Sequence, residues 1–226
     1  KIIDRFLDEA FISDFADNVL ATVEPNSILI TSGDTTTGAI WYLQSIGQRN
    51  DVVHLDANLL LFDWYAKNEI ARHPEILNAT FLTKRKNGTR ISEVIKENMA
   101  NRKIYTTFAT WVEPSDSNFD FVPVGVVYEA FLKGSQDEKL ALELNRTIWD
   151  KYKLKNIKAG IYQDFMVDSI VKYYAIMLND IGVTFFKFGF AKESLPYFNK
   201  SLDIFLSSKA KTNLENVEKF LHLNPE

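Results

Sequence analysis

Hydrophobic positions in the first 130 residues follow two alternating patterns. Short apolar, β-branched runs predict strands at 27–31, 51–56, 79–83, 103–108 and 124–131. Stretches with apolar residues at helical spacing predict helices at 2–21, 33–47, 59–72 and 91–101, with a solvated turn at 84–90. Strands that alternate with helices imply right-handed crossovers. We therefore predict an α/β fold, with a Rossmann-like, mainly parallel sheet covered by helices on both faces.

The last third of the sequence has a different pattern. Residues 151–226 contain no strand-like run and predict continuous helix, and large and small residues over 178–206 resemble one tetratricopeptide repeat. A single repeat is not normally stable by itself, so this region should pack on the α/β part or continue an array from a partner. We expect an α/β domain over 1–150 and an all-α, tetratricopeptide-like helical hairpin region over 151–226.

Composition narrows the function classes. The 226 residues carry a net charge of −4, with 15 basic and 22 acidic side chains in 1–150 and 11 and 8 in 151–226. This acidity argues against a nucleic-acid partner. The absence of cysteine excludes disulfides, thiolate zinc sites and a cysteine nucleophile. Three histidines argue against a histidine-rich metal site, and we expect no cofactor. No apolar run reaches the ~18 residues of a membrane span, and the chain opens on Lys1, so we expect an excised soluble piece of a longer protein.

Ligands of such sheets bind at the carboxyl ends of the strands. Here the segments that follow the strands, and that should form one rim, are Ser32–Asp34, Asp56–Asn58 and Ala109–Val112. The segment 33–37, Gly-Asp-Thr-Thr-Thr, follows a strand and opens a helix, where backbone N–H groups can hold a phosphate or carboxylate. It lacks the lysine of a P-loop and the glycine spacing of a dinucleotide site. Alternatively, Asp34 is simply the helix N-cap.

Three aspartates near this rim, Asp34, Asp56 and Asp63, could hold a divalent cation or the hydroxyls of a sugar beside Trp64. The structural alternative is that Asp56 or Asn58 caps the second helix. Their spacing matches no coordination loop, so no metal site is assigned. In the aromatic pairs 41–42 and 64–65, one member should face the sheet and the other the rim. The candidate ligand-binding residues are Gly33, Asp34, Thr35, Thr36, Asp56, Asp63, Trp64 and Tyr65.

No catalytic constellation is evident. His54 alternates within a strand, where a buried, hydrogen-bonded side chain is expected, and no serine lies in a strained strand-to-helix elbow. A pair of carboxylates suffices for glycosidase chemistry, but the sequence fixes no distance between two of them. The catalytic residues therefore stay unassigned.

Several motifs resemble a known family. The order and spacing of the segments 33–37 (Gly-Asp-Thr-Thr-Thr), 41–44 (Trp-Tyr-Leu-Gln), 51–52 (Asp-Val), 59–60 (Leu-Leu) and 63–65 (Asp-Trp-Tyr) are similar to a stretch of large bacterial multi-span membrane proteins of unknown function. Segments 102–105 and 125–128 resemble its later elements, so that the likeness covers about residues 25–132. Thr35 and Thr36 replace the family's Asn and Asp, and Asp56 stands where it has Asn.

The membrane part of that family resembles polytopic glycosyltransferases that use lipid-linked sugars, with O-mannosyltransferases among its eukaryotic relatives. The resemblance implies a non-catalytic soluble domain on the extracytoplasmic (periplasmic) face. Its partners would be the membrane-embedded part of the same protein and a glycan or protein acceptor that it binds or positions. The alternatives are a self-sufficient carboxylate- or metal-dependent enzyme acting on carbohydrate, and a pure protein-interaction scaffold.

Overall fold

A computed structural model describes residues 2–78, 82, 89–107, 119–134, 138–154, 157 and 164–224. The chain divides into two compact units. We call Val19–Phe121 with Val127–Gln136 the sheet unit, and Lys1–Asn18, Val122–Val126 and Asp137–Glu226 the helical unit. Within the described residues, no helix is both long enough and apolar enough to cross a bilayer. The predicted boundary between residues 150 and 151 stays a prediction.

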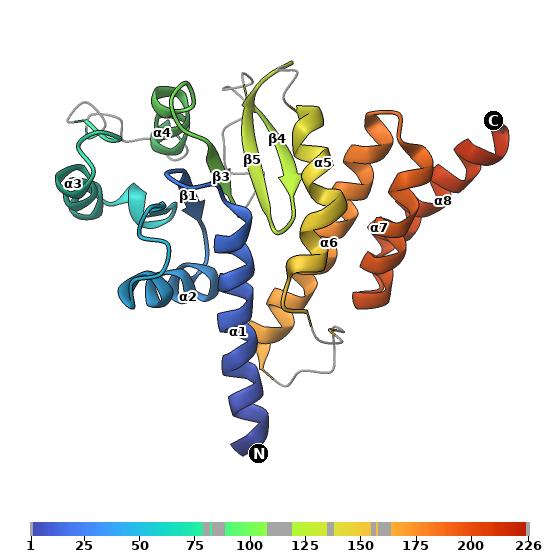
Figure 1. Ribbon diagram of the computed structural model, residues 1–226, viewed down its shortest axis with the longest axis horizontal. Coiled ribbons are helices and arrows are strands. Elements are labelled where there is room, and N and C mark those ends of the chain that lie inside the picture. The colour runs from blue at the N-terminus through green and yellow to red at the C-terminus, as the bar shows by residue number, and fades with distance from the viewer. Residues whose placement is uncertain are drawn as a thin grey trace. The chain divides into compact units, whose positions relative to one another are not determined.

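The sheet unit follows the predicted alternation of strands and helices (Figure 1). After the end of helix α1 (Ile2–Thr22), its elements are β1 (Ile28–Thr31), α2 (Asp34–Ser45), β2 (Val53–Asp56), the 3-10 helix η1 (Leu59–Leu61), α3 (Asp63–Arg72), α4 (Thr89–Asn98), β3 (Ile104–Thr106), the start of β4 (Phe119–Val124), which is divided between the two units after Phe121, and β5 (Val127–Leu132). The predicted helix over 59–72 is therefore two pieces, because the backbone is extended at Phe62.

The strands form one five-stranded mixed sheet in the order β2-β1-β3-β5-β4. Strand β1 pairs in parallel with β2 and β3, whereas β5 runs antiparallel to β3. The predicted mainly parallel sheet is thus correct only for β2, β1 and β3. The strand predicted over 124–131 is confirmed as β5 from Val127, but its start was wrong, because β4 and β5 meet at a turn at Gly125 and Val126, where Gly125 adopts φ 55°. A connection this short joins antiparallel strands, whereas a parallel pair needs a long crossover.

Alternation along the strands assigns their side chains to two faces. Ile28, Ile30, Val53 and Leu55 enter the main hydrophobic core, to which α3 and α4 also contribute. The intervening residues of β1 and β2 face α2, as shown by the hydrogen bond from Thr37 Oγ1 to Asp56 Oδ2. Arg90 is buried in α4, so the prediction of a solvated turn is wrong at this residue.

A buried ionic cluster lies near the start of β3. Lys103 Nζ is 2.8 Å from Glu24 Oε1 and 2.9 Å from Oε1 of Glu129 on β5. The Glu129 side chain is 3% exposed and that of Lys103 is 35% exposed. Burial raises the pKa of Glu129, opposed by the hydrogen bond and charge of Lys103. We call these three residues the Lys103 cluster.

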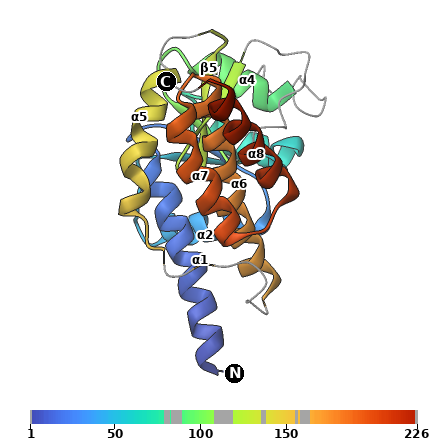
Figure 2. The ribbon, with the colours of Figure 1, turned by 90° about the vertical axis from the view of Figure 1, so that its right-hand side faces the viewer.

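The helical unit contains α5 (Glu138–Ile148), the 3-10 helix η3 (Trp149–Lys151), α6 (Phe165–Lys187), α7 (Ala191–Ile204) and α8 (Ser208–Leu223). Helices α6, α7 and α8 lie side by side (Figures 1 and 2). Asp164 caps α6, because its side chain accepts hydrogen bonds from the backbone N–H groups of Met166 and Val167. The prediction of a mostly helical C-terminal part is confirmed.

Small residues bring α6 and α7 close together. A Cβ at Gly182 would lie 2.9 Å from the ring of Phe198, and Ser201 Oγ donates to the Ala175 carbonyl at 2.7 Å. A large side chain of α7 therefore packs against a glycine of α6. The predicted strand over 79–83 and the rim segment 109–112 fall on residues that lie outside those described, apart from Leu82.

Candidate functional site

The carboxyl ends of β1, β2 and β3 meet at one rim, as predicted. Ser32, after β1, donates its backbone N–H to Thr107 Oγ1 beyond β3 at 3.3 Å. Asn58, beyond β2, donates its side-chain amide to Ser32 Oγ at 3.2 Å. The loops after the three parallel strands are therefore in direct contact.

The Gly-Asp motif begins α2. Gly33 occupies the N-cap position with φ 94°, where it makes no side-chain cap, so the alternative that Asp34 is the N-cap was wrong. Asp34 is exposed at the first helical position, where the helix dipole favours a carboxylate. Thr35 and Thr36 are half-buried in the same turn. The motif thus supplies a tight turn and a helix start.

The three predicted aspartates have separate surroundings. Asp56 is buried, and its Oδ1 accepts a hydrogen bond from the backbone N–H of Leu59, the first residue of η1, at 2.7 Å, while Asn58 at the N-cap position makes no side-chain cap. Asp63 pairs instead with the guanidinium of Arg90. Among the described residues, no group of three or more His, Cys, Asp or Glu side chains is arranged to hold a metal ion.

The two aromatic pairs behave differently. Trp64 is 57% exposed and lies edge-to-face with the buried Tyr65, so this pair divides between surface and core as predicted. The Tyr65 hydroxyl accepts from the Asp56 backbone N–H at 3.1 Å, and burial raises the pKa of Tyr65 to about 12. Trp41 and Tyr42 are both partly exposed, but the Trp41 ring centroid lies 6.1 Å from that of His54 on β2, so one member of this pair does face the sheet.

A pocket of about 260 Å³ lies beside the edge strand β2. We call it the α2–α3 pocket, because α2 and α3 supply two of its walls. Its lining combines an exposed indole with amide, imidazole, carboxylate and guanidinium groups, and consists of Trp41, Gln44, Asn50, Val52, His54, Tyr65, Glu69, Arg72 and His73. Tyr65 is therefore the one predicted site residue among those that line it.

One polar wall of the pocket belongs to α3. Glu69 is buried and has two basic neighbours. Its Oε1 lies 3.4 Å from Arg72 Nη1, and its Oε2 lies 4.0 Å from His73 Nε2. Burial raises the pKa of Glu69, and the charges of Arg72 and His73 oppose this rise. The pocket thus has a carboxylate and a guanidinium close together on the same wall.

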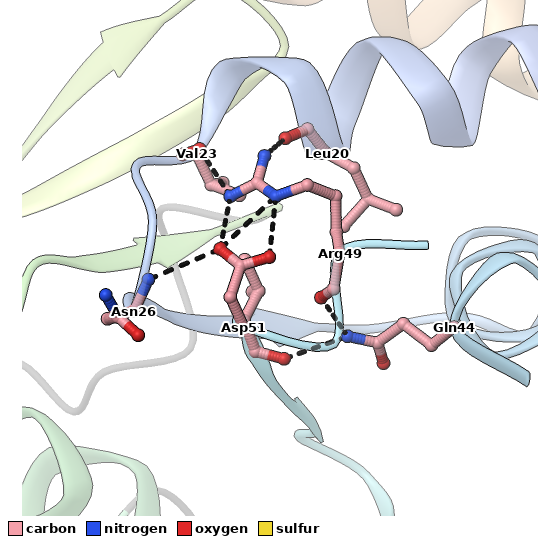
Figure 3. A network of polar contacts seen from close by, with 7 residues as sticks. Leu20, Val23, Asn26, Gln44, Arg49 and Asp51 are labelled. Carbon is pink, nitrogen blue, oxygen red and sulfur yellow. Dashed lines mark hydrogen bonds and ion pairs between the residues drawn. The ribbon is translucent and has the colours of Figure 1, made fainter. Parts of the chain in front are cut away.

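Gln44, a lining residue from α2, fixes the loop before β2 (Figure 3). Its side-chain amide donates to the carbonyls of Arg49 at 3.2 Å and Val52 at 2.8 Å. The Arg49 guanidinium binds the carbonyls of Leu20 and Val23 at the end of α1 and forms an ion pair with Asp51 at 3.0 Å. The loop before β2 is therefore anchored on both sides.

His54 forms the floor near Trp41. The two ring centroids are 6.1 Å apart, and His54 Nε2 lies 2.7 Å from Thr31 Oγ1. The sequence expectation of a buried, hydrogen-bonded histidine is confirmed. Desolvation lowers the pKa of His54 to about 4, although the negative charge of Asp56 acts in the opposite direction.

Most pocket residues were absent from the sequence-based candidates. The spacing of Tyr65, Glu69 and His73 puts them on one helical face, and His54 and Asp56 share a strand face, but neither pattern signals a pocket. Only the position of α3 beside β2 brings these groups together. A glutamate on a largely buried helix face is the single sequence signal that could have drawn attention to this wall.

Comparison with known families gives one match. Residues 12–75 are similar to the family model described as TMEM260-associated domain 2. Neither the curated proteins nor the solved structures yielded a match. The matched stretch includes every residue that lines the α2–α3 pocket. The chain is thus similar, over its first sheet-forming segment, to a TMEM260-associated domain.

Proposed function

We propose that this chain is a non-catalytic, extracytoplasmic domain of a larger membrane protein, and that the α2–α3 pocket binds a sugar unit of a glycan or glycosylated acceptor. The family match and the resemblance of its motifs to multi-span proteins that look like lipid-linked-sugar glycosyltransferases support this context. The domain would hold its ligand near the membrane-embedded part of the same protein.

The observation that carries the proposal is the combination of groups in the pocket. An indole face suits the apolar C–H face of a sugar ring, while neighbouring carboxylate, guanidinium and amide groups suit its hydroxyls. Trp41 is 42% exposed, which leaves part of its ring accessible. The volume of about 260 Å³ lies just below the range of about 300–1,000 Å³ for ligand pockets, and suits one sugar ring.

The helical unit fits the same proposal as a protein-contact element. We infer that α6 and α7 form a tetratricopeptide-like hairpin, supported by the contact of Gly182 with Phe198. The Rossmann-like relationship of the sheet unit is likewise an inference, supported by the parallel order β2-β1-β3.

The test is a titration of the 226-residue chain with methyl glycosides of mannose, glucose, galactose and N-acetylglucosamine, followed by NMR. We expect binding at about millimolar Kd, near −4 kcal/mol, with shifts in the Trp41 indole and in α3 amides. Trp41→Ala should abolish these shifts. Trp64→Ala is the matched control, since Trp64 is equally prominent but does not line the pocket.

Two results would contradict the proposal. Binding that survives in Trp41→Ala, or that is lost in Trp64→Ala, would place the ligand elsewhere. Cleavage of an added aryl glycoside by the chain itself, lost in Glu69→Gln, would instead favour the rival enzyme, in which a carboxylate with a raised pKa acts as an acid.

A further inference from the structure

Four side chains form a continuous hydrogen-bonded chain beneath the pocket. His54 Nε2 lies 2.7 Å from Thr31 Oγ1, which lies 2.8 Å from Thr37 Oγ1. Thr37 Oγ1 in turn donates to Asp56 Oδ2 at 2.7 Å. All four residues are buried. We call this set the His54–Asp56 relay.

The direction of each hydrogen bond in the relay follows from the number of protons available. The single hydroxyl proton of Thr37 is used toward Asp56, so Thr37 can only accept from Thr31. The proton of Thr31 is then used as well, and Thr31 must accept from His54 Nε2. The Asp56 carboxylate therefore sets the direction of every hydrogen bond in the relay, and the imidazole proton of His54 lies on Nε2.

The consequence is a bare lone pair on the other ring nitrogen. In a neutral imidazole one nitrogen donates and the other accepts, so Nδ1 of His54 is the acceptor. Nδ1 is buried and has no hydrogen-bond partner among the described residues. Buried polar atoms are rarely left without a partner, which makes this one an unfilled acceptor at the floor of the pocket.

The backbone of His54 adds further hydrogen-bonding groups at the same place. Val53 and Ala57 donate their N–H groups to Ser27 and Thr31 of the β1 side, so the N–H and C=O of His54 point away from β1, to the side of β2 on which no strand of the described residues pairs. The neighbouring edge groups are already engaged, the Val52 carbonyl by Gln44 and the Asp56 N–H by Tyr65. Between these two contacts, only His54 has backbone groups that point away from β1. A stretch of one residue is too short to pair with an added strand.

We propose that His54 selects the ligand of the α2–α3 pocket by accepting a hydrogen bond at Nδ1 from a hydroxyl of a neutral sugar, with Thr31, Thr37 and Asp56 as positioning residues. The inference rests on the proposed function. An acidic sugar would bring its carboxylate toward the lone pair of Nδ1 and toward Glu69, and both contacts are repulsive. The Arg72 guanidinium attracts this carboxylate less, because the Arg72 side chain is 72% exposed and already pairs with Glu69. Nδ1 is covered in this conformation, so binding as proposed requires a side chain that lines the pocket to move aside.

The first measurement is ¹⁵N NMR of the histidine rings in the complete chain. We expect His54 to be neutral at pH 6–8 with its proton on Nε2. Thr37→Val should release Thr31 to donate toward Nε2, moving population to the Nδ1–H form. Thr35→Val, in the same turn but outside the relay, is the matched control and should leave the tautomer unchanged.

The second measurement compares methyl glucoside with methyl glucuronoside, which differ by a carboxylate. We expect the glucoside to shift the Nδ1 resonance of His54 and to bind at least about tenfold more tightly than the glucuronoside. Thr37→Val should weaken glucoside binding by about tenfold, which corresponds to 1.4 kcal/mol. Sugar binding with the proton on Nδ1, or equal binding of the glucuronoside, overturns this inference and leaves the proposed function intact. If His54 shows the expected tautomer but none of the tested sugars binds, the proposed function is overturned, and so is the ligand assigned to His54.

Discussion

Replacing Lys103 with methionine should expose the cost of the buried Glu129 carboxylate. Methionine keeps most of the length and apolar bulk of lysine but removes the ammonium that lies 2.9 Å from Glu129 Oε1. Removing one partner of a fully buried ion pair costs about 3–5 kcal/mol. Since 35% of the Lys103 side chain is exposed, water screens the pair, and we expect about 2–3 kcal/mol at pH 8.

The stability lost in Lys103→Met should increase with pH. The pKa of Glu129 is already raised above its ordinary value of 4.5 by burial, and Lys103 opposes that rise. Without Lys103 the pKa in the folded state moves further up, while the unfolded value is unchanged. A carboxyl group whose folded pKa is raised stabilises the fold while it is protonated, and this contribution is lost as pH rises from the unfolded pKa toward the folded one. The variant should therefore be closest to the wild type near pH 5 and furthest from it near pH 8.

Urea unfolding followed by circular dichroism at pH 5 and pH 8 measures both free energies of unfolding. Lys133→Met, at an exposed lysine after β5, is the control and should stay within about 0.5 kcal/mol of the wild type. Adding Glu129→Gln to Lys103→Met should remove the pH dependence. A penalty of equal size at both pH values, or one no larger than that of Lys133→Met, would refute the assigned role of the Lys103 cluster.

Two glycine substitutions test the backbone and packing arguments. Gly182→Ala puts a Cβ 2.9 Å from the Phe198 ring. Overpacking costs about 1–3 kcal/mol, which should exceed the gain of about 1 kcal/mol in helix propensity. Thermal unfolding should therefore show a lower Tm, and adding Phe198→Leu should restore it. Gly33→Ala must adopt φ 94° and should cost about 1–3 kcal/mol, whereas Gly38→Ala, inside α2 with open space around it, should stabilise by about 1 kcal/mol. Equal stabilities of these last two variants would contradict the backbone assignment at Gly33.

Some parts of the fold were predictable because the signal is local. The runs at 28–31, 53–56 and 104–106 are short and contain apolar and β-branched residues, and each forms a buried strand. The rim formed by Ser32 and Asn58 was also predictable, since carboxyl ends of parallel strands meet at one edge. The β4–β5 hairpin was missed because Gly125 interrupts an apolar run by a single turn, which periodicity does not resolve.

The candidate site shows where local reasoning ends. Asp56 was selected as a ligand-binding residue, yet Leu59 and Thr37 use both of its oxygens, and its effect on the pocket passes through Thr31 to His54. Asp63 was selected for the same reason and is instead paired with Arg90, 27 positions away in the sequence. A sequence shows which groups can form hydrogen bonds, but partners distant along the chain depend on how the helices pack.

The sequence by itself determined most of the elements, the face of each buried strand and the edge where the strand ends meet, because these follow from periods of 2 and 3.6 residues along one segment. Tertiary structure alone decided that Glu69 and Arg72 of α3 lie beside Trp41 of α2 at the edge of β2. It also decided which nitrogen of His54 carries the proton. That choice depends on three side chains from β1, α2 and β2, and it exists only once they are packed together.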